Sequence, residues 1–216
     1  MSRSKSSASW LREHFDDVYV KKAQADGVRS RAVYKLEELI ERDRLLKPGM
    51  RVVDLGAAPG SWSQLVRQRL GDSGTVIALD ILPMQGIGGV DFLHGDFREE
   101  SVLQELEQRL DGNKLDLVLS DMAPNMSGVA LADQIRAMDL AELALDFSLN
   151  WLKPGGAFLI KLFQGAGFDD YLRRLRADFT RVSMRKPKAS RARSREVYAL
   201  AVGRKASGGQ TGERHA

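Results

Sequence analysis

The 216-residue sequence has no cysteine, only three histidines and no long apolar run. The absence of cysteine excludes a disulfide framework and a thiolate metal site. The histidines His14, His94 and His215 lack the spacing of a metal site, so no bound metal is expected. No apolar run reaches the ~18 residues that a membrane span needs, and the first residues lack the apolar core of a signal peptide. These absences predict a cytoplasmic protein that does not enter a membrane.

The sequence is rich enough in apolar residues (43%) to build one domain of ordinary size, and its net charge is +4. The positive charge gathers in two places. Residues 185–195 hold six cations and no acid, and the first 35 residues hold eight cations interleaved with aromatic side chains. A single basic run is usually a solvated loop. Two such runs in one chain favour contact with RNA or DNA.

The most informative stretch is 52–62, in which an apolar run ends at Asp54 and leads through Gly, Ala and Pro into an amphipathic segment. This pattern predicts a strand, a tight turn and a helix. The spacing differs from the Gly-x-Gly-x-x-Gly of dinucleotide folds, and no phosphate-binding Lys-Ser/Thr pair follows, which argues against a dehydrogenase and a nucleotide triphosphatase. The stretch looks like the S-adenosylmethionine (SAM) loop of class I methyltransferases; an ordinary strand–turn–helix is the alternative.

Three further apolar runs also deliver an aspartate at their carboxyl ends, namely Asp80, Asp96 and Asp121. In an open parallel sheet the carboxyl ends of the strands share one edge, where ligands bind. Asp80 follows Gly60 by 20 residues, the separation at which an acid accepts hydrogen bonds from ribose hydroxyls. In class I methyltransferases an acid in the place of Asp96 contacts the adenine amine. Helix capping is the alternative role for any one of them.

Strand and helix patterns alternate along the chain, which predicts an α/β Rossmann-like class I SAM-dependent methyltransferase fold. We expect a seven-stranded, mostly parallel sheet with helices on both faces. Its last two strands, 179–185 and 196–202, have only the basic loop between them and should pair antiparallel. The other expected strands are 51–55, 75–80, 90–94, 115–120 and 156–162, and the expected helices are 61–70, 99–110, 133–152 and 168–177, with an earlier helix that begins near Ser30.

The domain organisation follows from the same patterns. Residues 1–29 are predicted to be a basic N-terminal extension, and residues 30–204 the methyltransferase domain. Residues 205–216 are rich in glycine and polar side chains, which predicts a disordered tail.

Four charged residues stand out from their surroundings: Lys35, Asp121, Lys161 and Glu196. Asp121 and Lys161 end apolar strands, so both should reach the edge of the sheet at which SAM is expected. The pattern of the sequence alone does not bring Lys35 or Glu196 to that edge. A surface charge or a salt bridge is the usual role of such a residue taken alone.

The chain resembles the FtsJ/RlmE family of ribosomal-RNA large-subunit ribose 2′-O-methyltransferases from about Arg29 to Gly203. The resemblance lies in residues 30–36, 54–64, 120–125, 161–165, 186–187 and 190–198. It implies a Lys-Asp-Lys-Glu catalytic tetrad and a set of SAM contacts. The tetrad falls on Lys35, Asp121, Lys161 and Glu196, and the SAM contacts fall on Gly60, Trp62, Asp80, Asp96 and Asp121. It further implies methylation of a uridine in the A-loop of 23S rRNA of the large ribosomal subunit. We expect the protein to be a monomer.

These residue types suit ribose methylation. A 2′-hydroxyl needs its proton loosened, and SAM carries its own leaving group, so a base and correct placement suffice without a metal. Lys161 is the candidate base or electrostatic stabiliser, which Asp121 could orient. Lys35 could supply a cation, and Glu196 could position Lys35 or the ribose. The alternatives are methylation of tRNA or another RNA, and a non-catalytic RNA-binding protein that retains the fold.

Overall fold

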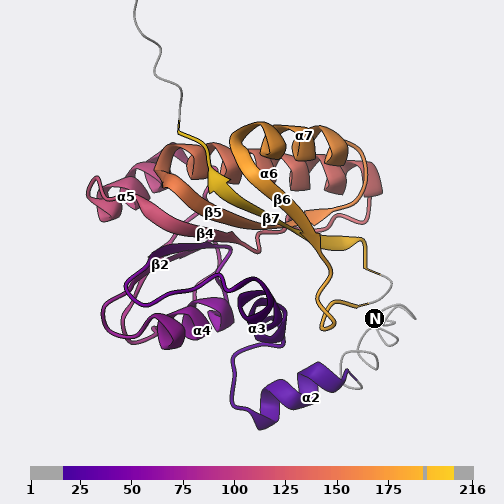
Figure 1. Cartoon of the computed structure of the whole chain (residues 1–216). Coiled ribbons are helices and arrows are strands. Elements are labelled where there is room, and N and C mark those ends of the chain that lie inside the picture. The colour runs from indigo at the N-terminus through magenta and orange to yellow at the C-terminus, as the bar shows by residue number, and fades with distance from the viewer. Residues whose placement is uncertain (1–16, 192–193, 207–216) are drawn as a thin grey trace, which may run out of the picture.

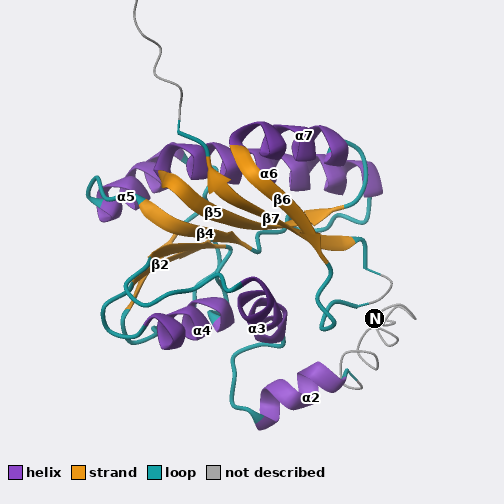
Figure 2. Ribbon diagram, in the orientation of Figure 1, coloured by secondary structure: helices purple, strands orange, loops and turns teal. Residues whose placement is uncertain are grey.

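A central sheet with helices on both faces forms the body of the molecule (Figures 1 and 2). The structure is a computed structural model and describes residues 17–191 and 194–206. The strands are β1 (Arg51–Leu55), β2 (Thr75–Asp80), β3 (Val90–His94), β4 (Leu115–Ser120), β5 (Leu152–Phe163), β6 (Phe179–Arg185) and β7 (Glu196–Arg204). The helices are α2 (Val18–Ala25), α3 (Ala32–Asp43), α4 (Ser61–Leu70), α5 (Glu100–Leu110), α6 (Ala130–Trp151) and α7 (Phe168–Asp178).

The seven strands lie in the order β3-β2-β1-β4-β5-β7-β6. Strands β1 to β5 are parallel to one another, whereas β7 pairs antiparallel with both β5 and β6. This confirms the Rossmann-like fold and the antiparallel end of the sheet that the sequence predicts. Because β7 runs in the opposite direction, it begins at the edge where β5 ends, and Lys161 is paired directly with Tyr198.

Most element bounds agree with the expected ones to within one residue, and three differ by more. Helix α6 begins at Ala130, three residues before its expected start, and β7 continues to Arg204. Strand β5 already begins at Leu152, although the sequence predicts a turn over residues 153–156. Leu152 pairs with Leu115 of β4, and the register then shifts so that Ala157 pairs with Leu117. The Pro-Gly-Gly stretch therefore forms an irregularity inside the strand and not a break before it.

The alternation of side chains along the strands decides which face carries the site. One face is covered by α5, α6 and α7, and the other by α3 and α4 (Figure 1). Leu159 and Leu200 belong to the core beneath α3. Residues two positions along a strand share a face, so Lys161 and Tyr198 point to that same side, nearer the edge. The catalytic candidates of β5 and β7 therefore face the helix that carries Lys35.

Helix α2 lies within the segment that the sequence predicts to be an N-terminal extension. Its N-cap Asp17 accepts a hydrogen bond from the backbone N–H of Tyr19 at 3.0 Å. Ala23 is buried in the core that α3 and α4 share, and the Tyr34 hydroxyl donates to Asp26 at 2.6 Å. Residues 17–29 thus pack on the methyltransferase domain. Of the predicted tail, only residues 205 and 206 lie within the described residues.

Candidate active site

The loop between β1 and α4 has two positions that only glycine fits well. Gly56 has φ +79°, and a Cβ there would lie 2.7 Å from the backbone nitrogen of Met122. Gly60 has φ +101° and directly precedes α4. A side chain would be strained at both positions. The loop therefore brings bare backbone to the carboxyl edge of the sheet, as expected for a site that surrounds a ligand closely.

Asp80 fastens this loop to the end of β2. It is 7% exposed, and its Oδ2 accepts the backbone N–H of Ala58 at 2.8 Å while its Oδ1 accepts that of Leu82 at 2.8 Å. A carboxylate oxygen has two lone pairs, so each can accept one further hydrogen bond. The position and the spare acceptors fit the two hydroxyls of a ribose.

Asp96 follows β3 and has a partner in its own loop. Arg98 binds it with both ends of its guanidinium, Nε to Oδ1 at 3.0 Å and Nη2 to Oδ2 at 2.6 Å. The hydrogen bonds from Arg98 hold the pKa of Asp96 below its usual range, although partial burial opposes this. The carboxylate is therefore charged at neutral pH. Both its oxygens accept hydrogen bonds from Arg98, and a ligand would use their remaining lone pairs.

Trp62 is buried and joins α4 to α3 and β7. Its indole N–H donates to the carbonyl of Ala32 at 2.8 Å, and its ring centre lies 5.9 Å from that of Tyr198. The side chain is 2% exposed. The backbone N–H of Trp62 lies in the first turn of α4, where N–H groups have no partner within the helix. A contact between Trp62 and SAM would therefore use this backbone group.

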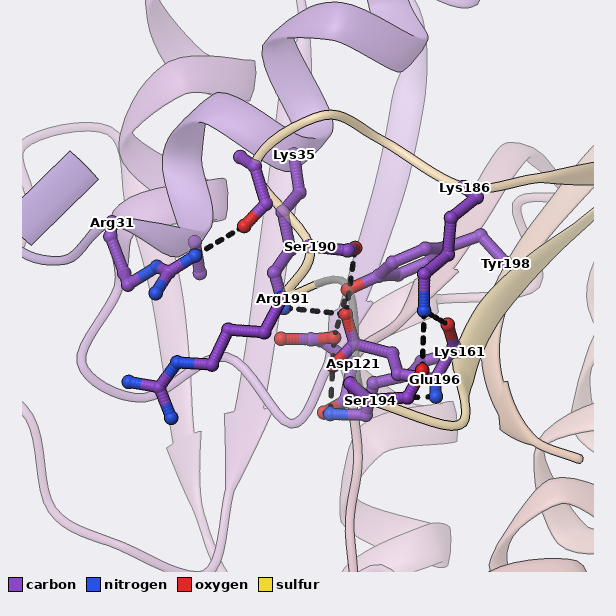
Figure 3. A network of polar contacts seen from close by, with 12 residues as sticks. Arg31, Lys35, Asp121, Lys161, Lys186, Ser190, Arg191, Ser194, Glu196 and Tyr198 are labelled. Atoms are coloured by element: carbon purple, nitrogen blue, oxygen red, sulfur yellow. Dashed lines mark hydrogen bonds and ion pairs between the residues drawn. The ribbon is translucent and has the colours of Figure 1, made fainter. Parts of the chain in front are cut away.

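The four predicted catalytic residues meet as two ion pairs at the carboxyl edge of the sheet (Figure 3). Lys161 Nζ lies 3.1 Å from Asp121 Oδ1 and also donates to the Asp121 carbonyl at 2.6 Å. Lys35 Nζ lies 2.7 Å from Glu196 Oε1. The side chain of Lys161 is only 9% exposed. Residues from α3, β5, β7 and the end of β4, separated by 161 positions at most, thus form one polar cluster.

Tyr198 connects the two pairs, and the sequence patterns did not single it out. Its hydroxyl donates to Asp121 Oδ1 at 2.9 Å, and Lys35 Nζ lies 5.9 Å from the centre of its ring. Burial, together with the charges of Asp121 and Glu196, raises the pKa of Tyr198 well above its usual value, so the hydroxyl keeps its proton. The period of a strand could have revealed this residue, because Tyr198 follows Glu196 by two positions and shares its face.

Glu196 is charged despite its burial. Burial alone would raise its pKa, but the charges of Lys35 and Lys161 and the hydrogen bonds from Lys35 and Ser190 outweigh burial and lower it. Ser190 Oγ donates to Glu196 Oε1 at 3.0 Å. The carboxylate therefore holds Lys35 in place and ties the loop before β7 to the cluster.

Asp54 is a buried acid beside the site. It is completely buried, and this burial raises its pKa to about 7, with the charges of Asp121 and Asp80 adding to the effect. The hydroxyl of Ser63 donates to its Oδ2 at 2.6 Å. Within the described part of the chain, its Oδ1 has no hydrogen-bond partner. Near neutral pH, therefore, both the protonated and the ionised form of the Asp54 carboxyl group are populated.

The basic run 185–195 divides into cations that build the loop and cations that face solvent. Arg185 binds Asp43 through both guanidinium ends, at 2.9 and 2.6 Å. Lys186 Nζ donates to the carbonyls of Ser194 and Glu196 at 2.6 and 2.5 Å. Lys188 and Arg195 are exposed, and the described residues place no acid within 4.0 Å of either side chain. Arg193 lies outside the described residues.

Arg31 and Arg191 share the carboxylate of Asp17. Arg31 forms an ion pair with it and donates to the carbonyl of Ala189, and Arg191 Nε lies 3.6 Å from it. Burial, followed by the charge of Arg191, lowers the pKa of Arg31. The N-terminal segment therefore contacts the basic loop, and Asp17 neutralises part of the positive charge of that loop.

Neither a metal site nor a membrane span is found in the part of the chain that the structure describes. Between residues 17 and 206, apart from 192–193, no three His, Cys, Asp or Glu side chains are grouped so that they could hold a metal ion. Over the same residues, none of the helices combines the length and the apolar character that crossing a membrane requires.

A mostly parallel sheet with a glycine loop after β1, and with aspartates at or just after the ends of β2, β3 and β4, is typical of a class I SAM-dependent methyltransferase. The model of the FtsJ-like methyltransferase family matches residues 28–204, and the chain belongs to this family. The protein is thus a methyltransferase, and SAM is its methyl donor.

Curated relatives match almost the whole chain. The "Ribosomal RNA large subunit methyltransferase E" of Stenotrophomonas maltophilia strain K279a is 68% identical over 205 residues, which cover 95% of this chain and 98% of the relative. The protein of the same name from Xanthomonas euvesicatoria pv. vesicatoria is 67% identical, over 94% of this chain and 97% of the relative. A crystal structure of a ribosomal RNA methyltransferase from Plasmodium falciparum has a TM-score of 0.74 and 28% identity, over 83% of this chain and 100% of that one.

Proposed function

We propose that the protein transfers the methyl group of SAM to the 2′-hydroxyl of a uridine in the A-loop of 23S rRNA of the large ribosomal subunit, and that it acts as a monomer. The observation that carries the proposal is the Lys161–Asp121 pair, which lies beside the Lys35–Glu196 pair at the edge where the glycine loop opens. The names of the relatives, at up to 68% identity, support rRNA of the large subunit as the substrate.

The residues of the chain have distinct roles in this reaction. When bound, SAM supplies a methyl group on a sulfonium, which needs no activation by a metal. In its neutral form Lys161 would accept the proton of the 2′-hydroxyl as the new O–C bond forms and the bond between the methyl group and the sulfur breaks. Asp121 orients the amine of Lys161, and the Tyr198 hydroxyl fixes the carboxylate of Asp121. Lys35, held by Glu196, provides a cation for the developing charge on the ribose oxygen.

The cofactor would be held by the groups at the ends of β1, β2 and β3. The backbone at Gly60 and Trp62 would surround the methionine part of SAM. Asp80 would accept the ribose hydroxyls and Asp96 the adenine amine, and Asp121 would lie near the methyl group. The exposed backbone of the glycine loop and the spare acceptors of Asp80 support this arrangement.

Assays with tritiated SAM on three substrates test the proposed function. Naked 23S rRNA or isolated large subunits should be labelled at a uridine ribose, and tRNA should not. Labelling of tRNA alone would favour the alternative tRNA methyltransferase. A protein that binds RNA and transfers no methyl group to any of the three would be the non-catalytic alternative.

Replacing Asp80 with alanine is expected to weaken SAM binding by roughly ten- to a hundredfold, because two ribose hydroxyls lose a charged acceptor. The variant also loses its bonds to Ala58 and Leu82, so its unfolding temperature is measured beside its affinity. The SAM affinity of Asp80→Asn, which keeps an acceptor oxygen, should lie between those of the wild type and of Asp80→Ala. Calorimetry that finds unchanged SAM affinity in a folded Asp80→Ala protein would remove Asp80 from the cofactor site.

Removing exposed cations of the basic loop is expected to weaken RNA binding and to flatten its salt dependence. The double variant Lys188→Ala, Arg195→Ala should reduce the slope of log K against log salt by somewhat under one for each phosphate that the protein no longer neutralises. SAM affinity should stay at the wild-type value. Arg173→Ala with Arg176→Ala, two cations of α7, is the charge-matched control. Equal slopes for both double variants would mean that the loop is only a solvated surface.

A further inference from the structure

Arg29 connects the N-terminal part of the chain to two loops beside the cofactor site. Its Nη1 donates to the carbonyl of Pro59 at 3.1 Å and to that of Gln85 at 2.7 Å. Its Nη2 donates to the carbonyl of Gly86 at 2.9 Å. The planar guanidinium can hold several acceptors in fixed directions, which a lysine ammonium cannot do. One side chain thereby links three carbonyls from segments that lie 30 and 56–57 residues away.

The segment that Arg29 holds lies directly against the glycine loop. A Cβ on Gly60 would be 2.8 Å from Ile87 Cδ1, 3.1 Å from Met84 Sδ and 3.3 Å from Arg29 Nη1. The connection between β2 and β3 is also fixed at its start, where Asp80 accepts the N–H of Leu82. Residues 84–87, Gly60 and the Arg29 guanidinium therefore meet at one point of the cofactor edge.

Further contacts hold the N-terminal segment alongside the cofactor loop. The hydroxyls of Ser30 and Ser61 lie 2.8 Å apart, and the Trp62 indole donates to the carbonyl of Ala32. Residues 29–32 thus run beside residues 59–62. The partners of Arg29 lie on the cofactor loop and on the connection between β2 and β3. Those of Arg31, in contrast, are Asp17 and the loop before β7.

We propose that Arg29 is a positioning residue for the cofactor: it holds the 84–87 segment against the glycine loop and so shapes the SAM site. Its guanidinium serves carbonyl oxygens of the chain itself and not an RNA phosphate. The inference rests on SAM binding at the carboxyl edge, as in the proposed function. A loop that is already in place costs less ordering when the ligand binds, so the loss of Arg29 should appear in SAM affinity.

The experiment compares Arg29→Ala, Arg29→Lys and a matched control by calorimetry with SAM, by RNA binding and by steady-state kinetics. The control is Lys205→Ala, which removes a cation that also donates to two carbonyls, those of Arg176 and Ala177. Arg29→Ala should raise the Kd and KM for SAM by about tenfold, while kcat at saturating SAM and the RNA Kd remain near wild type. Arg29→Lys should recover only part of the affinity, and the control should match wild type.

Hydrogen exchange separates this role from a general loss of stability. Amides of residues 84–88 should exchange faster in Arg29→Ala, while those of the buried strand β4 keep their protection. Wild-type SAM affinity with weakened RNA binding would overturn the inference and make Arg29 a phosphate contact. Wild-type values for both ligands would overturn it as well. A wild-type protein that fails to bind SAM would instead refute the cofactor site of the proposed function.

Discussion

Replacing Lys161 with alanine is expected to lower kcat by about 10²- to 10⁴-fold, the usual effect of losing a general base. The Lys161 side chain is 9% exposed, and its amine is held by the carbonyl and the carboxylate of Asp121. No other described amine bonds to Asp121. SAM and RNA affinity should change little, because the proposed contacts of both ligands lie on other residues. Single-turnover assays with separately measured affinities test this expectation.

Two further variants make the Lys161 test specific. The variant Lys161→Arg should not restore turnover, since a guanidinium stays protonated at any working pH. Lys153→Ala is the matched control, because Lys153 lies on the same strand β5 and also pairs with an aspartate, Asp116. Its kcat should match wild type. Near-normal turnover in Lys161→Ala would move the role of base elsewhere, with Asp121 as the next residue to test.

The variant Asp54→Asn is expected to gain stability relative to the wild type as pH rises from about 4 to 7. In the wild type the folded-state pKa of Asp54 is about 7, against an ordinary value of 3.8. Between these values the folded protein binds a proton that the unfolded chain has released, so wild-type stability falls as pH rises. The effect amounts to about 1.4 kcal/mol per pH unit and roughly 4 kcal/mol over the whole window. Asparagine cannot ionise, so residue 54 of the variant adds no change of stability with pH.

Urea unfolding of both proteins between pH 4.5 and 7.5 measures the difference. The carbonyl of asparagine can still accept the hydrogen bond from Ser63, and the buried amide adds a cost that does not depend on pH. Only the change with pH is therefore predicted. Asp139→Asn, at an exposed position of α6, is the reference for the loss of one carboxylate. A difference between Asp54→Asn and wild type that stays constant across the range would contradict the prediction.

The sequence predicts the position of those site residues that lie at the ends of parallel strands. Asp121 and Lys161 end parallel strands, so their meeting at one edge follows from the fold. Lys35 lies on a helix and Glu196 starts a strand, and only the resemblance to a family predicted that they reach this edge. Their meeting depends on the antiparallel direction of β7 and on the packing of α3, which local patterns do not encode.

Other features depend on tertiary contacts that no local pattern reveals. Helix α2 escapes prediction because Val20 and Ala23 are its only buried residues, too few for a clear apolar stripe. In the sequence Arg29 is one of the cations that favour RNA binding, since its carbonyl partners lie 30 and 56–57 residues away. Tyr198 looks like a core residue in its apolar strand, although its hydroxyl reaches Asp121.

The reversal of β7 places the proposed RNA-binding loop beside the catalytic ion pairs. Had β7 been parallel to β5, the segment before it would emerge at the opposite edge, far from Lys161. In the antiparallel arrangement the segment before β7 lies beside the catalytic ion pairs, and hydrogen bonds from Lys186 and Ser190 hold it to Glu196. If these two anchors are kept, the residues between them and β7 can be exchanged for those of a relative without disturbing the frame of the sheet. We therefore expect that exchanging this loop changes which RNA is bound and leaves the two catalytic ion pairs in place.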